Sequence, residues 1–495
     1  MDYSTLVASL LATSEAAPLL PLLEKLLGHL QYFAQLLASF RSQPITPTAT
    51  HHFEGQLQQR LRHLGLDLCD WTFNHLEPDQ RQQLPPRLDY DGQRYRCRDR
   101  SPNNIATLFG TCQLRRFLYE DLEPGNPCLF PLEKQLGIVA GAATPALAER
   151  AAWCLAQCPQ GGTLAVLAHD HDIHWSKDTL RQVTAAVAAG LESCRQEAQV
   201  EKLLGLLAKA QTSRGRFRPA LVVGRDGIHL PMRGQQPYKE GSTATLSVYD
   251  RRGRRLGTVY LGRMPQPGQA TLSEQLTALV LEVLRRWQGP LPRLAYVTDM
   301  GSHPTTYFCQ VLARLSHPRT GQRLEWQRIG DYYHAASYVG EMAEALFGDS
   351  KQGRKWLRRM LRRLKEKAGV KRVLQSATYH AWERGLCGRR QKAFTAAYKY
   401  LRRHGKWLRY WEYKAVGLPL GSGVTEAACK TVFTQRLKQS GMRWDVAGGQ
   451  VVVTLRVVLL SGVWTATVAK WLGGQQFPTT GVKQDVSTET QKNVA

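Results

Sequence analysis

The sequence predicts an α/β protein whose main sheet lies in the second half of the chain, with helices before and after it. Short apolar runs of strand-like composition, separated by turns or single helices, are concentrated between residues 216 and 340. Leucine and alanine at helical spacing dominate much of the remaining chain. These two patterns favour an α/β core preceded and followed by mainly helical regions.

The composition favours a folded protein with a polyanionic partner. The length of 495 residues is enough for roughly two to four domains. The residues are 43% hydrophobic and 21% charged, which is typical of a folded protein. Lysine and arginine outnumber the acids 66 to 40, which gives a net charge of +26. An excess this large favours DNA as the partner. No apolar run reaches the roughly 18 residues of a membrane span, and no leader pattern opens the chain. We therefore expect a cytoplasmic, nucleoid-associated protein without a membrane partner.

The ten cysteines are scattered along the chain. Cys154 and Cys158 are one helical turn apart, but no second pair has ligand spacing. We predict buried, reduced thiols rather than zinc ligands or disulfides.

The first 215 residues predict helices around a small region of strands. Residues 1–45 are leucine-rich and suit packing, including packing against a second copy of the chain. The stretch 44–48 is a predicted linker, and a second helix covers 51–66. Short strands are expected at 89–92 and 95–100, and a single strand at 109–119.

Residues 145–213 are predicted to be helical. Within them, a helix, a polar break from His169 to Trp175 and a helix capped by Ser176 have helix–turn–helix spacing. This pattern fits DNA reading, and it fits a plain helical hairpin as well.

The stretch from Arg218 to Asp331 predicts the sheet. Strands are expected at 221–226, 245–249 and 256–261, followed by a helix at 271–287, a strand at 294–298, a helix at 305–315 and a strand at 324–329. Asp226 lies on the first strand, Asp299 follows the fourth, and Asp331 follows the fifth. The order βββαβαβ with acids at these places is that of a ribonuclease H-like (RNase H-like) core.

A basic helical region interrupts the predicted core. Residues 351–411 contain 20 lysines and arginines but only two glutamates, far from a balanced solvated face. Aromatic residues are interleaved with the charges. We expect most of these aromatic side chains to be core and the charges to face DNA.

The stretch from Leu418 to Trp444 predicts the end of the core. A loop through Gly421, Ser422 and Gly423 leads into a helix that Ser422 or Thr425 could cap. Glu426 falls in the first helical turn, a place that the helix dipole favours for any carboxylate. A further helix is expected at 449–460, and the tail beyond Gly473 is expected to be disordered.

These patterns give seven predicted regions. They are a helical segment (1–48), a domain with short strands (49–144), a helix–turn–helix-like DNA-binding region (145–215), the first part of the core (216–340), the basic all-helical insertion (341–417), the last part of the core (418–472) and the disordered tail (473–495).

The acids predict metal-dependent chemistry. Phosphodiester transfer on DNA commonly uses two divalent cations about 3.5–4 Å apart, and Mg²⁺ prefers carboxylate oxygens. Neighbouring strands would bring Asp226 and Asp299 together, and Glu426 would join them from a helix over the sheet. Each acid alone could be structural. Asp331 and His334, three residues apart, fit either a supporting role at this site or hydrogen bonding within the core.

Several motifs resemble the bacterial ISKra-type insertion-sequence transposases, relatives of the Mutator-like group. They are VVGRDGIHLPM, YVTDMGSH, RIGDYYHAA and the long PLGSGVTEAACKTVFTQRLKQSGMRW, with YRCRDR, LFGTCQLRRFLYE and LFPLEKQLG earlier in the chain. The resemblance covers about residues 90–475. Many members of the family carry a Cys-x-x-Cys zinc pair after the tyrosine that corresponds to Tyr119. Only Cys128 stands near that place here, so no zinc site is expected.

The resemblance implies a DDE transposase with an RNase H-like core and a helical insertion before the last acid. Asp226, Asp299 and Glu426 take the three acidic places and would hold two Mg²⁺ or Mn²⁺ ions, and His334 takes the place of the family histidine. We expect cleavage at the element's terminal inverted repeats and strand transfer into target DNA, by a homodimer or a larger homo-oligomer. The residues expected to hold DNA are Lys430, Arg436, Lys438, Arg443 and Trp444.

Two alternatives remain on the sequence alone. One is an RNase H-like nuclease or junction resolvase that cuts without strand transfer. The other is a domesticated DNA-binding protein without catalysis.

Overall fold

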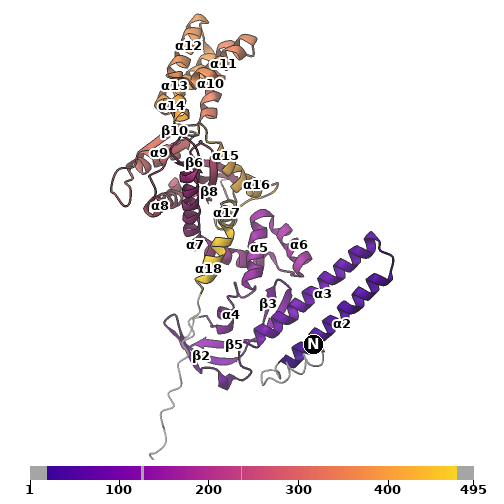
Figure 1. The fold of residues 1–495 in the computed structure, drawn as a ribbon. Coiled ribbons are helices and arrows are strands. Elements are labelled where there is room, and N and C mark those ends of the chain that lie inside the picture. Colours follow the sequence, from indigo (N-terminus) through magenta and orange to yellow (C-terminus); the bar gives the residue numbers. More distant parts are fainter. Residues whose placement is uncertain (1–18, 124–126, 236, 476–495) are drawn as a thin grey trace, which may run out of the picture. The chain divides into compact units, whose positions relative to one another are not determined.

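The computed structural model describes residues 19–123, 127–235 and 237–475 (Figure 1). Residues 1–18 of the predicted helical segment and residues 476–495 of the predicted tail lie outside the described residues. The chain divides into two compact units, one formed by residues 1–187 and 472–495 and the other by residues 188–471.

The first unit begins with two long helices, α2 (Leu20–Ser42) and α3 (Pro47–Asn74), that pack against each other. The Thr46 hydroxyl caps α3 by accepting a hydrogen bond from the Ala49 N–H at 3.1 Å. The predicted linker at 44–48 therefore ends too late, because Pro47 is the first helical residue. Proline suits this place, since the first helical N–H has no partner in the helix.

The small strands of this unit form two sheets. A three-stranded antiparallel sheet has the order β1-β2-β5, and β3 pairs with β4. Their bounds are β1 (Arg87–Tyr90), β2 (Gln93–Arg100), β3 (Asn103–Thr107), β4 (Gly110–Leu114) and β5 (Phe117–Asp121).

The single strand predicted at 109–119 is wrong, because β4 and β5 belong to different sheets. Cys112 and Leu114 are buried at even positions, whereas Phe117 and Tyr119 are buried at odd positions. Side chains alternate across a strand with a period of two. The switch from buried even positions to buried odd positions therefore marks the end of β4 and the start of β5, which the continuous apolar pattern did not indicate.

Helices complete the first unit. They are η2 (Arg81–Gln83), α4 (Pro131–Gln135), α5 (Pro145–Gln157), α6 (Gln160–His171) and the beginning of α7 (Lys177–Thr212). Between α6 and α7 the chain breaks as predicted, and the Ser176 hydroxyl accepts the Thr179 N–H at 3.0 Å. The local helix–break–helix pattern is confirmed.

A five-stranded mixed sheet forms the centre of the second unit, in the order β10-β9-β6-β7-β8. Strands β6, β7 and β8 are antiparallel neighbours, whereas β9 is parallel to both β6 and β10. The strands are β6 (Ala220–Pro231), β7 (Tyr238–Tyr249), β8 (Arg255–Arg263), β9 (Arg293–Thr298) and β10 (Trp326–Gly330). All five were predicted, but β6 and β7 are much longer than the apolar runs that indicated them.

Helices connect the last strands. They are η3 (Pro267–Gln269), α8 (Ala270–Arg286), α9 (Ser302–Gln310) and η4 (Leu312–Arg314). The helix predicted at 305–315 is wrong at both ends, because α9 begins at Ser302 and breaks at Val311.

The two faces of the sheet belong to different hydrophobic clusters. Leu221 and Val223 of β6 pack with the second half of α7 and with α8. Val222 packs on the opposite face, with helices that follow β10. The second half of α7 is thus part of the sheet's core, so the region predicted at 145–215 does not stay together as one unit.

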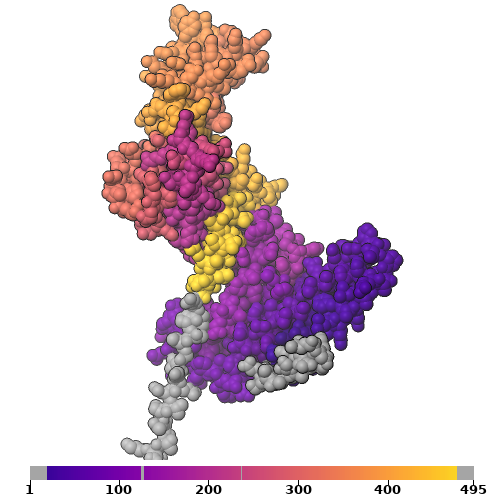
Figure 2. Space-filling model, viewed as in Figure 1, coloured from indigo at the N-terminus to yellow at the C-terminus, as the bar shows by residue number. Residues whose placement is uncertain are grey.

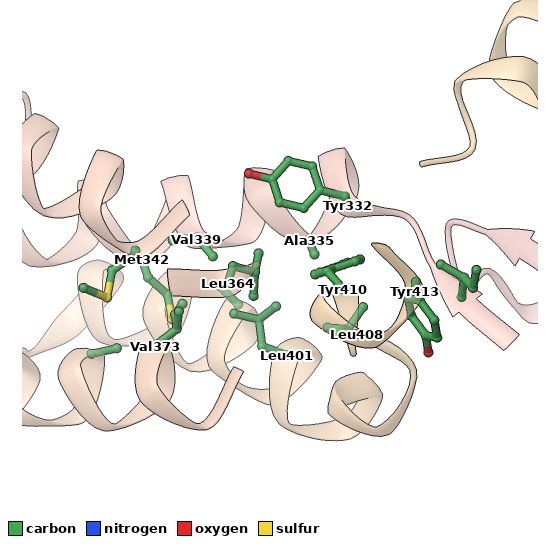
Figure 3. Close-up of a cluster of buried hydrophobic side chains, with 14 of the residues drawn as sticks. Tyr332, Ala335, Val339, Met342, Leu364, Val373, Leu401, Leu408, Tyr410 and Tyr413 are labelled. Carbon is green, nitrogen blue, oxygen red and sulfur yellow. The ribbon is translucent and has the colours of Figure 1, made fainter. Parts of the chain in front are cut away.

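The basic insertion is helical, as predicted. Its elements are α10 (Tyr332–Phe347), α11 (Lys351–Leu364), α12 (Gly369–Glu383), α13 (Gly388–His404), η5 (Gly405–Trp407) and α14 (Tyr410–Ala415). One continuous apolar core runs from the sheet along α10 into these helices, as Figure 3 shows for Ala335, Val339, Met342 and Val373. Figure 2 shows the outer surface of the insertion in orange.

The aromatic residues of the insertion divide into two groups. Trp356, Phe394 and Tyr410 are buried, as predicted. Tyr379, Trp382 and Trp411 are 57%, 80% and 53% exposed, so these three are exceptions to the expectation that most of the aromatic side chains are core. Amphipathic helices place aromatic residues on either face, and composition alone does not distinguish the two faces.

The last elements of the described residues are α15 (Gly423–Ala428), a π-helical turn labelled η6 (Cys429–Thr434), α16 (Gln435–Leu437), α17 (Val446–Leu460) and α18 (Trp464–Gly473). The predicted helix at 449–460 is confirmed. The single helix expected after Gly423 is interrupted by the π-helical turn, a feature often found at functional sites.

No single helix within the described ranges has the length and apolar character needed to cross a membrane. Only α17 and α18 taken together pass that test, and they are bent by 114° at the break between them.

All ten cysteines lie within the described residues and are free, as predicted. Cys128, Cys309 and Cys387 are exposed, so the prediction of burial is wrong for these three.

Candidate active site

The first two predicted acids lie just beyond the last paired residues of the adjacent parallel strands β6 and β9. In the register of β6 and β9, Gly224 is opposite Val297. Asp226 and Asp299 each follow two residues after this pair. Neighbouring strands lie about 4.8 Å apart, so the register brings the two acids to one edge of the sheet.

Asp331 stands at the same edge. It directly follows Gly330 of β10, which is opposite Thr298 of β9, and the Asp331 N–H donates to the Thr298 carbonyl at 2.9 Å. Three strands therefore each deliver an acid to this end of the sheet.

All three acids lie on one face by the alternation of side chains. Val222, Val297 and Ile329 belong to the cluster on the side of α10 and the insertion. Asp226, Asp299 and Asp331 follow these residues by an even number of positions, which favours the same face. The face that carries the acids is the one that α15 covers.

The close approach of α15 to β6 depends on a glycine. A Cβ at Gly224 would lie 1.9 Å from the Thr425 hydroxyl oxygen. This hydroxyl is buried and lies 2.8 Å from the Thr245 hydroxyl of β7. Any larger residue at 224 would push α15, and Glu426 with it, away from the sheet.

Asp226 is held in a partly buried pocket of negative charge. Its Oδ1 accepts the Gly227 N–H at 2.8 Å, and the Cys429 thiol donates to its Oδ2 at 3.4 Å. Burial raises the pKa of Asp226, and the charges of Asp299 and Glu426 raise it further, although these two hydrogen bonds oppose the change. Asp226, Asp299 and Glu426 therefore interact electrostatically in one place.

Asp299 is fixed by a tight turn. Its Oδ1 accepts the Gly301 N–H at 2.9 Å. Met300 between them has a φ of +71°, which is uncommon for a residue with a side chain. The Tyr400 hydroxyl of the insertion donates to the Asp299 carbonyl at 3.1 Å. The insertion thus contacts the backbone of Asp299 and helps to fix its position.

Glu426 is connected to Asp331 through Ser422. The Ser422 hydroxyl lies 2.8 Å from Oε1 of Glu426 and 2.9 Å from Oδ2 of Asp331. Asp331 is fully buried and also accepts the backbone N–H groups of Ser422 and His334. Asp331 is therefore a support for the loop before Glu426 and for the start of α10.

This network corrects the predicted cap of α15. Ser422 occupies the N-cap position, but its side chain makes no capping hydrogen bond. Thr425 is buried against Thr245 instead. Both hydroxyls are used in tertiary contacts, which a local capping rule does not include.

His334 lies among aromatic rings of the insertion. Its ring centroid is 5.3 Å from that of Tyr338 and 5.6 Å from that of Tyr400. Tyr400 in turn donates to the Asp299 carbonyl. His334 therefore lies beside the candidate site, in ring contact with the tyrosine that is hydrogen-bonded to the Asp299 carbonyl.

Cys429 is a site residue that sequence reasoning missed. It lies one residue beyond α15, in the π-helical turn, and burial raises the pKa of its thiol. The charge of Asp226 adds to this effect, so the thiol stays protonated and remains a hydrogen-bond donor. Its position three residues after Glu426 was the available signal, since such residues share a helix face.

The predicted DNA-binding residues do not all lie on the surface. Lys430, Lys438 and Arg443 are exposed. Arg436 is 1% exposed, with its guanidinium carbon 5.7 Å from the centre of the Trp444 ring. Arg436 therefore does not fit the prediction that it holds a phosphate.

Trp444 is partly buried and structurally engaged. Its indole N–H donates to the Leu437 carbonyl at 2.9 Å, and its backbone N–H donates to the Pro231 carbonyl at the end of β6. Stacking of Trp444 on a base would need this indole to leave its present hydrogen bond.

The acid cluster consists of carboxylates, the ligand type that Mg²⁺ prefers. Among the described residues, no group of three or more His, Cys, Asp and Glu side chains could already hold a metal ion. Mutual repulsion at Asp226 favours a cation at this place, and carboxylate oxygens are the ligands that Mg²⁺ prefers. Oε1 of Glu426 accepts the Ser422 hydroxyl, and the remaining lone pairs of the carboxylate stay free to bind a cation.

No protein-family model matches this chain, and no curated protein matches it either.

Proposed function

We propose that this chain is a metal-dependent DNA transposase with an RNase H-like core, acting as a homodimer or a larger homo-oligomer. The observation that carries the proposal is the meeting of Asp226, Asp299 and Glu426, which are far apart along the chain, at one end of a five-stranded mixed sheet. The chain order β6, β7, β8, α8, β9, α9 and β10 matches the predicted βββαβαβ and supports the RNase H-like assignment.

Asp226, Asp299 and Glu426 would hold two Mg²⁺ or Mn²⁺ ions. When bound, such ions activate an attacking oxygen and stabilise the leaving oxygen of an in-line displacement. Asp226 would supply a carboxylate from within β6, Asp299 from the residue after β9, and Glu426 from the six-residue helix α15. Asp331 and Ser422 hold the loop that orients Glu426, and Tyr400 supports the Asp299 turn.

The basic insertion and the exposed residues Lys430, Lys438 and Arg443 would hold DNA near these acids. The insertion is directly connected to the candidate site, since the Tyr410 hydroxyl lies 3.0 Å from the Gly330 carbonyl and 3.1 Å from the Asp331 carbonyl. A nuclease that only hydrolyses DNA would use the same acids, so the products of the reaction distinguish the two activities.

The test is a strand-transfer assay. The purified chain is incubated with Mn²⁺ or Mg²⁺, linear DNA carrying the sequences that flank its own gene, and a supercoiled plasmid. We expect donor ends joined to the plasmid. The variant Asp299→Asn should lose cleavage and joining by at least about a thousandfold and should keep DNA binding.

Asp349→Asn is the matched control, because Asp349 is an exposed acid outside the site, paired only with Arg354 in the described contacts. Its products should equal those of the wild type. Nicked or cut DNA without joined products would favour the nuclease, and binding without any product would favour the non-catalytic DNA-binding protein.

A further inference from the structure

A cavity of about 900 Å³ opens in the insertion, away from the acids themselves. Its lining comes from residues 366–368, the first half of α12, the end of α13, η5 and α14. Figure 1 shows α12, α13 and α14 in orange. This volume is within the range of roughly 300–1,000 Å³ that is usual for small-ligand sites.

The cavity combines apolar and aromatic walls. Val370, Leu374 and Leu408 supply aliphatic surface, and Tyr398 and Trp411 supply rings. Trp411 is 53% exposed although it lines the cavity. An indole that is half-exposed in a concave site is free to stack on a flat ligand.

Cations surround these walls. Five basic side chains and two glutamates line the cavity. Glu412 pairs with Arg409 at 2.9 Å, and Glu366 pairs with Arg372 at 3.0 Å. The remaining lining cations, Lys367, Lys371, Arg402 and Lys406, make no ion pair with any carboxylate in the described part of the chain. Their charge remains available for an anionic ligand.

The wall of the cavity is continuous with the candidate active site. Leu408 of the wall lies against Gly330, where an added Cβ would be 2.5 Å from its Cδ2. Tyr410, next to Trp411, is hydrogen-bonded to the carbonyls of Gly330 and Asp331. Leu408 and Tyr410 therefore connect the wall of the cavity to the backbone on which Asp331 stands.

We propose that this cavity receives an unpaired nucleotide of the DNA strand that the acids act on. An aromatic surface for the base together with nearby cations for the phosphate is the combination that binds single-stranded nucleic acid. This inference rests on the proposed function, because it assumes that DNA reaches the acids. An acidic helical peptide is the less favoured ligand, because apolar anchors at helical spacing need an elongated groove.

The test compares two DNA duplexes of the same sequence, one blunt and one with a short unpaired strand at one end. A 2-aminopurine base in the unpaired strand reports stacking. Binding is measured in EDTA with the full chain. We expect the wild type to bind the unpaired-strand DNA about tenfold more tightly than the blunt DNA, with quenching of 2-aminopurine.

Trp411→Ala should remove this preference, and Trp411→Phe should keep most of it. Trp382→Ala is the matched control, because Trp382 is 80% exposed on the same insertion but does not line the cavity. It should change the affinity for both DNAs equally. Thermal melting of each variant shows that loss of preference is not loss of fold.

The cations are tested in the same way. For the unpaired-strand DNA, the plot of log K against log salt concentration should become less steep by about 1.4 in the double variant Lys371→Gln with Arg402→Gln, because two phosphate contacts are lost. The control pair Arg389→Gln with Arg390→Gln lies outside the cavity and should affect both DNAs alike.

A preference that survives Trp411→Ala overturns the proposal. So does an acidic peptide that binds at Trp411 while unpaired DNA does not. If the chain transfers strands but binds both DNAs equally, the cavity is not a nucleotide site and the proposed activity stands. If it binds the unpaired-strand DNA more tightly but transfers no strands, the proposed activity is wrong and the cavity remains a nucleotide site.

Discussion

Asp226 and Asp299 are positioned by the backbone of a sheet, whereas Glu426 is positioned by side chains. The register of β6 and β9 fixes the first two acids, and backbone N–H groups of Gly227 and Gly301 hold their carboxylates. Glu426 depends on the Ser422 hydroxyl, on buried Asp331 and on a six-residue helix followed by a π-helical turn.

We therefore expect the half of the site that carries Asp226 and Asp299 to be more rigid than the half that carries Glu426. Backbone pairing of several strands survives the change of any one side chain, so the strand half is preformed. The helix half has fewer supports, and its acid is oriented by a hydrogen bond from one side chain, that of Ser422. We therefore expect the strand half to determine where ions bind and the helix half to determine whether the site closes.

The largest expected effect concerns Asp226 and metal. If the strand half is preformed, Mg²⁺ at about a hundred times its dissociation constant should stabilise the wild type by about 2.7 kcal/mol. For a unit of this size that is a rise in Tm of roughly 5 °C. Asp226→Asn should abolish the rise, and Asp349→Asn should keep it. An unchanged rise in the Asp226 variant would mean that this acid does not hold the ion.

The same variant has a pH dependence whose sign follows from the raised pKa of Asp226. A carboxyl whose pKa in the folded state lies above its ordinary value of 3.8 favours folding when protonated. Without metal, wild type and Asp226→Asn should therefore match in stability at low pH. The wild type should become the less stable of the two as pH rises through the raised pKa. Melting curves across this range give the difference.

The second effect concerns Ser422. Ser422→Ala removes the hydroxyl that connects Asp331 with Glu426. Changes in groups that orient metal ligands commonly cost tenfold to a hundredfold in metal affinity or activity. We therefore expect the cleavage activity to fall about tenfold to a hundredfold. The concentration of Mg²⁺ at half-maximal cleavage should rise, which a purely structural role would not cause.

Ser422→Thr retains the hydroxyl and should recover most of the activity. Ser337→Ala is the control, because the Ser337 hydroxyl is exposed and donates only to the His334 carbonyl in the described contacts. Equal Mg²⁺ dependence in Ser422→Ala and the wild type would contradict the positioning role.

The smallest effect concerns the contact that joins the two halves. Thr245 and Thr425 share a buried hydrogen bond of 2.8 Å. Thr425→Val alone should cost about 1–3 kcal/mol of stability, because it leaves the Thr245 hydroxyl without that partner. Adding Thr245→Val should recover much of the loss, since both polar groups are then gone. A double-mutant cycle by denaturant unfolding measures the coupling, and simple additivity would show that the halves are independent.

Much of the sheet was predictable because its signals are local. Apolar runs ending in an acid indicated β6, β9 and β10, and the short turns between the first strands indicated antiparallel pairing. The predicted places of Asp299 and Asp331 at strand ends were correct to the residue. The capping of α15 and the burial of Arg436 were not predictable, because they depend on what packs against those residues.

The sequence by itself determined which segments become strands and helices and on which of them the acids stand, since side-chain periodicity and turn residues act over a few positions. Only the tertiary structure decided that Cys429 meets Asp226 across 203 residues, that Ser422 joins Asp331 to Glu426 across 91, and that Trp411 lines a basic cavity. These contacts join residues far apart in the chain. No local pattern encodes them, because each depends on the packing of several elements at once.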